Sequence, residues 1–182
     1  MILTHYHVLL ARTLAEKAHC NQLYGNFPFL KHLEDVTKCA MSFGVGSPEI
    51  LVTCFLHDTL EDTCCSLKTI QAFFGDTVAK AVEALTNGND NKPRYDLLVG
   101  SNLGLLVKLF DRLANISQAI LEGNPKGIKY VKQHKEFEQL LYQEKHASIW
   151  EVLNGKIAMY ETLLKETYFE THTKPTMVGQ LL

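Results

Sequence analysis

One short stretch constrains this chain more than any other, because it places ionisable side chains directly after an apolar run. Residues 55–63 read Phe-Leu-His-Asp-Thr-Leu-Glu-Asp-Thr and follow the apolar segment 50–56. One imidazole and three carboxylates stand between His57 and Asp62. Such groups at the end of a buried helix cost free energy unless something compensates them, and a metal ion is the simplest compensation. The sequence therefore predicts that other segments supply further metal ligands.

The spacing within this stretch also predicts which side chains share a helix face. If the helix continues through it, His57 and Glu61 are neighbours, because residues four apart lie one turn from each other. The same spacing brings Asp58 and Asp62 together.

Composition limits the class of protein. The chain has 182 residues, of which 46% are hydrophobic, and a formal net charge of −2. These values suit one domain with a real core, which we place at residues 1–170, followed by a loosely held tail at 171–182. No basic field favours nucleic acid as a partner. No apolar run approaches the roughly 20 residues that a membrane span needs.

The cysteines and the N-terminus bear on the compartment. The five cysteines are an odd number and lack the spacing of a zinc finger, while Cys39 and Cys54 lie in apolar helical patterns that favour core positions. Residues 1–5 lack the basic and apolar regions of a signal peptide. We therefore expect reduced thiols and a cytoplasmic location.

Helical periodicity dominates the sequence, and no useful run alternates in the manner of a strand. We therefore predict one all-α domain. Loops are expected where turn-forming residues cluster, at 25–28 and 87–93. The predicted helices are 3–20, 32–43, a helix that opens at Pro48 and carries His57 and Asp58, 66–74, 76–85, 93–99, 103–121, 126–143 and 145–169.

Three places put metal-type side chains on otherwise apolar helical faces. His32 leads one apolar stripe, His57 and Asp58 follow a second, and Asp111 interrupts a third. Two imidazoles and two carboxylates without a thiolate favour manganese, iron or a similar divalent ion. Such a metal would lower the pKa of a bound water and supply a nucleophile at neutral pH.

Polar neighbours of these residues could complete an active site. Glu61 and Asp62 have no evident structural role, and either could accept or steer the proton of a water. Asn115 lies four residues after Asp111 and could face the same cavity. Lys108 lies three residues before Asp111 and could reach a phosphate.

Each of these signals has an ordinary structural explanation when taken alone. A His-Asp dipeptide is more often a surface or packing feature, and a histidine such as His32 on an apolar face is more often a satisfied core residue. Asp111 could form a surface ion pair with Arg112. Their ordered spacing along successive helices favours the metal site over these separate explanations.

The order of these motifs resembles the HD phosphohydrolase superfamily. The closer resemblance is to the hydrolase domain of RelA/SpoT proteins and to their stand-alone small alarmone hydrolases. The H-D-x-x-E-D-T motif of that group stands complete at 57–63, and 107–115 is similar to V-K-L-A-D-R-x-x-N. Residues 28–33 replace the P-Y-I-x-H-P segment, and Phe-Gly follows at 74–75. The resemblance covers roughly residues 8–120.

This resemblance implies a helical HD-domain fold and a manganese-dependent hydrolase. Such enzymes remove the 3′-pyrophosphate from guanosine tetra- or pentaphosphate, (p)ppGpp, the alarmone of the stringent response, and leave GDP or GTP. It also implies roles for particular residues. The metal ligands would be His32, His57, Asp58 and Asp111, and the residues that position or deprotonate the water would be Glu61 and Asp62.

The implied substrate contacts are less complete. Asn115 would lie near the ribose, and Lys92 and Arg94 stand where the family places cations for the phosphates. The family usually carries basic residues in the loop that precedes the first ligand, but residues 22–27 contain no cation. Tyr24 or Phe27 could stack on a base instead, or could simply pack within the loop.

Two other functions stay open. The chain could be an HD phosphohydrolase that acts on another nucleotide or on a 3′-phosphorylated cofactor such as NADPH. It could also be a nucleotide-binding module with a decayed site, although every ligand and both motif carboxylates are present. Apolar residues of the last helices, such as Trp150 and Phe169, could support a homodimer or pack on the core.

Overall fold

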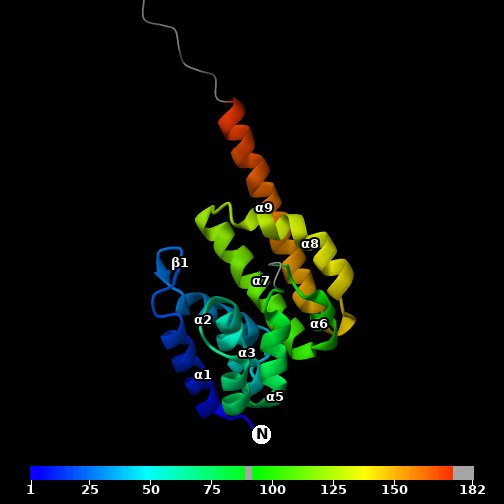
Figure 1. Cartoon of the computed structure of the whole chain (residues 1–182). Helices are drawn as coiled ribbons and strands as arrows, with labels where there is room; N and C mark the ends of the chain where they lie inside the picture. Colours follow the sequence, from blue (N-terminus) through cyan, green and yellow to red (C-terminus); the bar gives the residue numbers. More distant parts are fainter. Residues whose placement is uncertain (89–91, 174–182) are drawn as a thin grey trace, which may run out of the picture.

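Helices form most of the part of the chain that the computed structural model describes, residues 1–88 and 92–173, with side chains described through residue 166 (Figure 1). The predicted all-α class is therefore confirmed. The helices are α1 (His5–Ala18), α2 (Leu30–Ser42), α3 (Pro48–Leu56), α4 (Thr59–Asp62), α5 (Leu67–Leu85), α6 (Tyr95–Gly100), α7 (Asn102–Glu122), α8 (Gly127–Leu141), the 3-10 helix η1 (Glu144–His146) and α9 (Ala147–Thr173).

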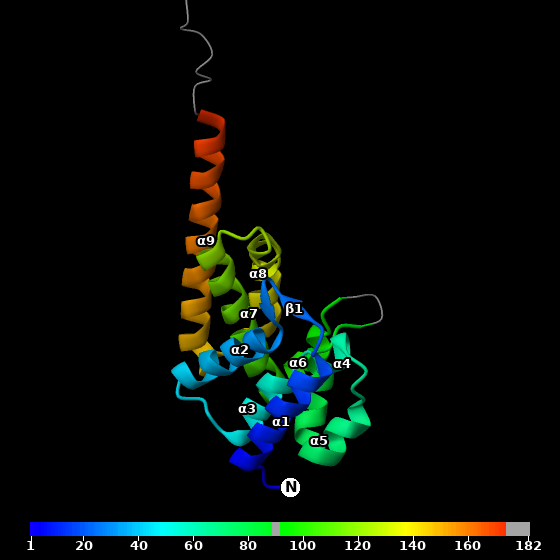
Figure 2. The same cartoon turned by 90° about the vertical axis from the view of Figure 1, so that its left-hand side faces the viewer.

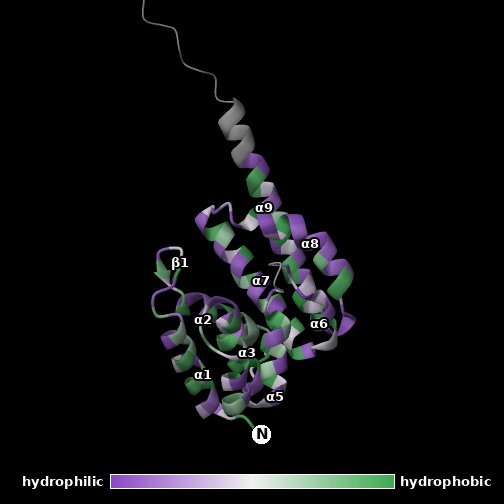
Figure 3. Ribbon diagram, viewed as in Figure 1, coloured by the Kyte–Doolittle hydropathy of each residue, from purple (hydrophilic) through white to green (hydrophobic). Residues whose placement is uncertain are grey.

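The long helix α7 organises the arrangement, because it packs against α2, α3, α5, α8 and α9. Apolar residues are frequent along α3 and α5, whereas α8 mixes polar and apolar residues (Figure 3). Two views show α9 running beyond the other helices, at the end of the molecule opposite the N-terminus (Figures 1 and 2). None of the described helices is both long enough and apolar enough to cross a membrane.

Two apolar clusters form the core, and both include residues of α2, α3 and α5. The first gathers residues of α7, α8 and α9 around Phe110, Phe137 and Trp150. The second gathers residues of α1, α2, α3 and α5, with Leu33 and Leu56 fully buried. The residues predicted to bind metal lie where these two clusters meet, since they come from α2, from the end of α3 and from α7.

Local sequence signals explain most helix boundaries. Ser47 precedes α3, Pro48 opens it and Glu49 lies in its first turn, as expected for a helix N-terminus. Ser101 caps α7 by accepting a hydrogen bond from Gly104. Gly123 ends the same helix in the left-handed conformation, with φ of 60°, which glycine adopts without steric cost.

The structure corrects two details of the predicted fold and confirms a third. The helix that begins at Pro48 does not run through the HD motif, because α3 ends at Leu56 and α4 begins only at Thr59. The predicted break between the helices 66–74 and 76–85 is confirmed, because Gly75, with φ of 83°, interrupts α5. Strands β1 (Leu23–Tyr24) and β2 (Phe27–Pro28), an antiparallel pair of two residues each, were not predicted.

Several packing predictions can be compared with the structure. Trp150 is 1% exposed and packs in the core, which agrees with the second of its two predicted roles. The side chain of Phe169 lies outside the described residues, as do residues 89–91 of the predicted loop and 174–182 of the predicted tail. Cys54 is fully buried and Cys39 packs partly buried against the core, as predicted.

Candidate active site

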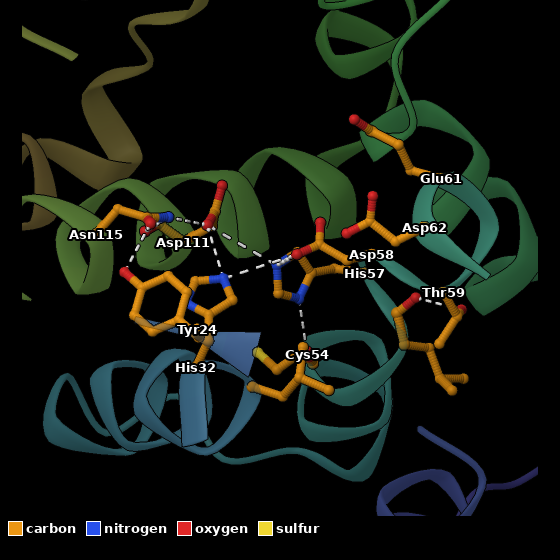
Figure 4. A network of polar contacts seen from close by, with 12 residues as sticks. Tyr24, His32, Cys54, His57, Asp58, Thr59, Glu61, Asp62, Asp111 and Asn115 are labelled. Atoms are coloured by element: carbon orange, nitrogen blue, oxygen red, sulfur yellow. Dashed lines mark hydrogen bonds and ion pairs between the residues drawn. The ribbon is translucent and has the colours of Figure 1, made fainter. Parts of the chain in front are cut away.

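Three buried side chains converge where α2, α3 and α7 meet (Figure 4). Each of the residues His32, His57 and Asp111 offers one atom to a group in which all such atoms lie within 4.8 Å of one another. The His32 Nε2 atom lies 3.3 Å from Asp111 Oδ1, and the His57 Nε2 atom lies 3.8 Å from the same oxygen. The predicted ligands from three separate segments are thus brought together by the fold.

Asp58 lies beside this group. Its Oδ2 atom is 3.1 Å from His57 Nε2 and 3.7 Å from His32 Nε2. It follows the end of α3 and precedes α4, with φ of −100° and ψ of −2°. The break between these two helices directs Asp58 toward the imidazoles (Figure 4). Its role as a fourth ligand stays a prediction.

The tautomer of His57 prepares it for a metal. Its Nδ1 atom lies 2.8 Å from the Cys54 carbonyl oxygen, which can only accept a hydrogen bond, so the proton of the neutral ring belongs on Nδ1. The opposite nitrogen, Nε2, is buried and makes no hydrogen bond to the described residues. A buried, orphaned nitrogen with a free lone pair beside carboxylates is the arrangement that a divalent metal satisfies. The donor set therefore fits a metal ion.

Without a metal, the cluster is a strongly coupled set of charges. Burial alone would lower the pKa of His57, but Asp58 and Asp111 outweigh this effect and raise it to about 9. Burial would raise the pKa of Asp111, but Lys108 and the two imidazoles hold it well below its usual range. The carboxylates therefore carry negative charge in a site of low dielectric, which favours cations.

The hydrogen bonds described for the two motif carboxylates come from neutral amides. The side chain of Gln22 donates a hydrogen bond of 3.0 Å to Asp62 Oδ2. Asn87 donates its backbone N–H to Glu61 Oε2 at 3.0 Å and its side-chain amide to Oε1 at 2.8 Å. Both carboxylates project from the α4 segment on the Asp58 side of the cluster (Figure 4).

The orientation of Gln22 is itself fixed. Its Oε1 atom lies 2.6 Å from Nδ1 of the buried His19, whose ring stacks on Phe29 with centroids 4.5 Å apart. The ring of His19 thus determines which end of the Gln22 amide faces Asp62. The sequence indicated no role for Gln22, because its contact with Asp62 joins positions that are 40 residues apart.

Tyr24 and Asn115, both predicted to contact substrate, are bonded to each other and to the metal-type cluster. The Tyr24 hydroxyl donates to Asn115 Oδ1 at 2.9 Å, and the Asn115 amide donates to Asp111 Oδ1. The Tyr24 ring also stacks on His32, with centroids 4.7 Å apart. These contacts show that both residues hold metal-type side chains, while their predicted contact with substrate is untested.

The predicted cations are not equally placed. Lys108 is mostly buried and pairs with Asp111 Oδ2 at 3.1 Å, and its pKa is raised because the charges of Asp111 and Asp58 outweigh its burial. Lys92 and Arg94 are not among the described residues that line the cavity beside the cluster. Their contact with phosphate stays a prediction.

Arg112, which the sequence suggested only as a possible surface ion-pair partner of Asp111, is buried and contacts aromatic rings. Its guanidinium lies over the rings of Phe137 and Tyr130, 4.0 Å and 5.3 Å from their centroids, and donates to the Tyr130 carbonyl oxygen. Burial lowers the pKa of Arg112 from its ordinary value. Arg112 therefore both packs the core and lines the cavity beside the cluster.

That cavity, here named the metal cavity, has a volume of about 350 Å³. It is bounded on one side by the cluster and by Glu61 and Asp62, and on the other by α8. The α8 residues were not predicted as site residues, because they lie outside the recognised motifs and their spacing from those motifs in the sequence gives no signal. They are Lys129, Tyr130 and Gln133.

Known hydrolases are similar to this chain in sequence, although no family model matches it. It is 28% identical over 137 residues to a guanosine-3′,5′-bis(diphosphate) 3′-pyrophosphohydrolase of Aquifex aeolicus, covering 70% of this chain but 19% of that protein. It is 25% identical over 171 residues to guanosine-3′,5′-bis(diphosphate) 3′-pyrophosphohydrolase MESH1 of Danio rerio, covering 88% and 91% of the two chains.

A solved structure agrees with these relatives in fold. It is described as a metazoan ortholog of SpoT that hydrolyses ppGpp and plays a role in starvation responses. The match has a TM-score of 0.57 at 19% identity and covers 92% of this chain and 97% of the other. This chain is similar to the SpoT-type hydrolases in sequence and in fold. The predicted resemblance is therefore confirmed.

The relatives differ in how much of their length this chain spans. It spans about a fifth of the Aquifex protein but nearly all of the zebrafish one. Its extent is thus close to that of the shorter relative. The segment carrying the His/His/Asp cluster lies within the residues of the predicted resemblance, whereas α8 lies beyond them.

Proposed function

We propose that this chain is a Mn²⁺-dependent hydrolase that removes the 3′-pyrophosphate of (p)ppGpp and leaves GDP or GTP. The observation that carries the proposal is the buried cluster of His32, His57 and Asp111, with two amide-held carboxylates at the edge of the same cavity. Relatives named for this reaction supply the substrate.

The proposed metal site uses nitrogen and oxygen donors only. We assign His32, His57, Asp58 and Asp111 as the residues that would hold the ion. A donor set without thiolate suits manganese better than the softer metals. When bound, the ion supplies Lewis acidity and a nucleophilic water at neutral pH.

Residues of the chain accept the proton that the attacking water loses. Attack of water on the 3′-linked phosphorus breaks the bond to the ribose 3′ oxygen, so the hydroxyl leaves with pyrophosphate and a proton must reach the ribose oxygen. Glu61 or Asp62 accepts the proton of the water in this scheme, and the resulting carboxylic acid returns it to the departing ribose oxygen. Gln22 and Asn87 support that role, because a carboxylate fixed by hydrogen bonds keeps its acceptor atom in one place.

Cations around the metal cavity offset the charge of the substrate. Lys108, Arg112 and Lys129 line it together with the carboxylates. Lys108 is already paired with Asp111, so we assign the exposed Lys129 as the cation most able to turn toward a phosphate. Charge-assisted hydrogen bonds to phosphate are about twice as strong as neutral ones.

A second substrate class has one observation in its favour. The loop at 22–27 contains no cation, and Tyr24 already contacts both His32 and Asn115. A hydrolase of another phosphorylated nucleotide would fit such a loop. The description of NADPH as a 3′-phosphorylated cofactor is wrong, because NADPH carries its extra phosphate on the ribose 2′ oxygen. Turnover of NADPH would therefore require the site to accept a phosphate at that position.

Incubation of the purified chain with Mn²⁺ and ppGpp tests the proposal. We expect GDP and pyrophosphate in equal amounts, and no product above background from the His57→Ala variant. A panel containing GTP, NADPH and ppGpp separates the two substrate classes, because only the first proposal requires a 3′-pyrophosphate. Turnover of ppGpp that is equal in the wild type and in His57→Ala would contradict the proposal.

We also propose a reducing, cytoplasmic environment for the chain. All five cysteines are free, as that environment would keep them. Homodimer formation stays a prediction.

A further inference from the structure

A second cavity of about 280 Å³ lies next to the metal cavity. The two share Tyr24, Asn115 and Lys129 among their walls. The remaining walls of this side cavity come from the turn at Gly25, from the end of α7 and from the start of α8. A molecule that fills the metal cavity with its phosphates could therefore place its remaining part here.

The carboxylate of Glu122 is the acidic group of this side cavity. Glu122 is the last residue of α7, where the helix dipole is negative and disfavours an acid. Its described partners are neutral amides, since Gln118 donates to Oε1 and Asn124 donates to Oε2 at 3.4 Å. Glu122 is exposed, and among the described residues its carboxylate has hydrogen bonds to these amides but no ion pair with Lys126 or Lys129, which line the same cavity.

The same amides and a close turn fix where the carboxylate lies. Each of its oxygens accepts one hydrogen bond, which leaves further acceptor capacity on both. A Cβ atom at Gly25 would lie 3.9 Å from Glu122 Oε1, so the β1–β2 turn reaches van der Waals distance of the acid. Glu122 is therefore an oriented acceptor at the wall of the cavity.

Tyr24 contributes an aromatic wall to the side cavity. One face of its ring is covered by His32, and Lys126 Nζ lies 5.9 Å from the ring centroid, so a base that stacks on Tyr24 has to displace that lysine. Stacking on an aromatic ring tolerates any base, because every base has a π-face. Tyr24 could hold a base but would not select one, and selection must come from a hydrogen-bonding group.

We propose that Glu122 is the residue that selects guanine, by accepting hydrogen bonds from N1–H and from the 2-amino group. A carboxylate has acceptors only, and guanine offers these two donors side by side on its Watson–Crick edge. Adenine offers an acceptor at N1, which a carboxylate repels. The inference rests on the proposed function, since it takes the substrate to be a guanosine nucleotide with its 3′-pyrophosphate in the metal cavity.

This assignment accounts for the cation-free loop. Cations in a loop can read the guanine O6 acceptor, but residues 22–27 supply none. Recognition of the two donors of guanine requires an acceptor instead, and residues 22–27 contain no carboxylate. Glu122 at the end of α7 meets that requirement, facing the turn that closes the loop.

The test measures turnover of the 3′,5′-bis(diphosphates) of guanosine, inosine and adenosine by wild type and Glu122→Gln. The wild type should prefer guanosine, then inosine, which lacks the 2-amino group, then adenosine. The variant should lose about 10- to 100-fold in kcat/KM for guanosine, through KM rather than kcat. It should gain for adenosine, because glutamine can donate to N1 and accept from the 6-amino group.

Controls separate selection from folding and from catalysis. Glu122→Ala should lose the guanosine preference without the adenosine gain, and Glu151→Gln on the exposed side of α9 should match the wild type. Thermal unfolding shows whether each variant is folded. An unchanged order of bases in folded Glu122→Gln would overturn the assignment.

Binding of GDP, IDP and ADP without Mn²⁺ distinguishes failure of this inference from failure of the proposed function. If the wild type does not hydrolyse ppGpp, the proposed function fails. The base assignment still stands if Glu122→Gln reverses the order of GDP and ADP affinity. If the order stays the same, the base assignment fails as well.

Discussion

The cluster side and the α8 side of the metal cavity differ in how they are built. On the cluster side, His32, His57 and Asp111 are each at most 6% exposed, and their ligand atoms lie within 4.8 Å of one another. On the α8 side, Lys129 is exposed and makes its described contact with an aromatic ring. Buried, closely packed groups are held in one geometry, whereas exposed side chains can adapt.

We infer from this difference that the cluster side determines the type of reaction, whereas the α8 side determines which nucleotide is bound. The cluster side comes from segments within the resemblance to the SpoT-type hydrolases, and α8 and the end of α7 lie at or beyond its limit. Low dielectric strengthens the electrostatic interactions of the cluster. The chemistry can therefore be retained while the walls that contact the nucleotide change. Substitutions and metal removal test that division, and the largest effect is expected at a buried ligand.

Replacing a buried ligand should abolish activity, whereas replacing a wall residue should not. We expect His57→Ala to reduce pyrophosphate release to the level of a protein-free blank, because a ligand is lost and the carboxylates of Asp58 and Asp111 lose one of their neutralising partners. Lys129→Ala should raise KM and keep most of kcat. Release of pyrophosphate from ppGpp measures both.

His5→Ala is the matched control, because His5 is exposed and far from the motif in sequence. It should behave as the wild type. Equal losses of kcat in His57→Ala and Lys129→Ala would contradict the division between the two sides.

Removing the metal should inactivate the chain and lower its stability. Treatment with a chelator should stop turnover, and added Mn²⁺ should restore it. Mn²⁺ at 100 times its dissociation constant would stabilise the fold by about 2.7 kcal/mol, a rise in Tm of about 5–10 °C for a domain of this size. The measurement is a thermal unfolding curve with and without Mn²⁺.

The same shift should be absent in Asp111→Asn, which keeps the shape of the ligand and removes its charge. A full Mn²⁺-dependent shift in that variant would place the ion elsewhere. A shift with no return of activity would separate metal binding from the proposed reaction.

Loss of the amide that holds Asp62 should slow the reaction without preventing substrate binding. In Gln22→Leu, Asp62 loses the hydrogen bond that joins it to the β1 region, so its carboxylate is free to turn. We expect kcat to fall by about 10- to 100-fold with little change in KM, an effect typical of residues that orient active groups. Steady-state kinetics with ppGpp measure it.

Gln71→Leu provides the control, because Gln71 also donates to a carboxylate, Asp76, but outside the metal cavity. It should leave kcat unchanged. A rise of KM alone in Gln22→Leu would show that Gln22 contacts substrate rather than positioning Asp62.

Removing one hydroxyl on the aromatic wall should have the smallest effect. Tyr24→Phe keeps the ring stacked on His32 but loses the hydrogen bond to Asn115. We expect a loss of about 1 kcal/mol in stability, with kcat/KM changed only a few-fold. Chemical denaturation measures the first and kinetics the second, and Tyr6→Phe, at an exposed position, is the control.

The sequence predicted much of the fold because helical periodicity is a local property. The predicted helix at 103–121 lies within one residue of α7 at each end, since Ser101 and Gly123 are strong local boundary signals. The break after Leu56 was not predicted, because the apolar run gives no sign that the helix ends there. The β1–β2 pair was missed because two-residue strands have too few residues to show an alternation.

Only part of the site could be predicted from the sequence, because sequence patterns report local structure. The sequence alone determined the metal-type residues, since their types and helical positions are local facts, and the resemblance added the expected reaction. Only the tertiary structure decided what surrounds them: Gln22 on Asp62, Asn87 on Glu61, and α8 across the cavity. These contacts join residues far apart in the chain, and distance in space is set by how the helices pack rather than by any pattern within one helix.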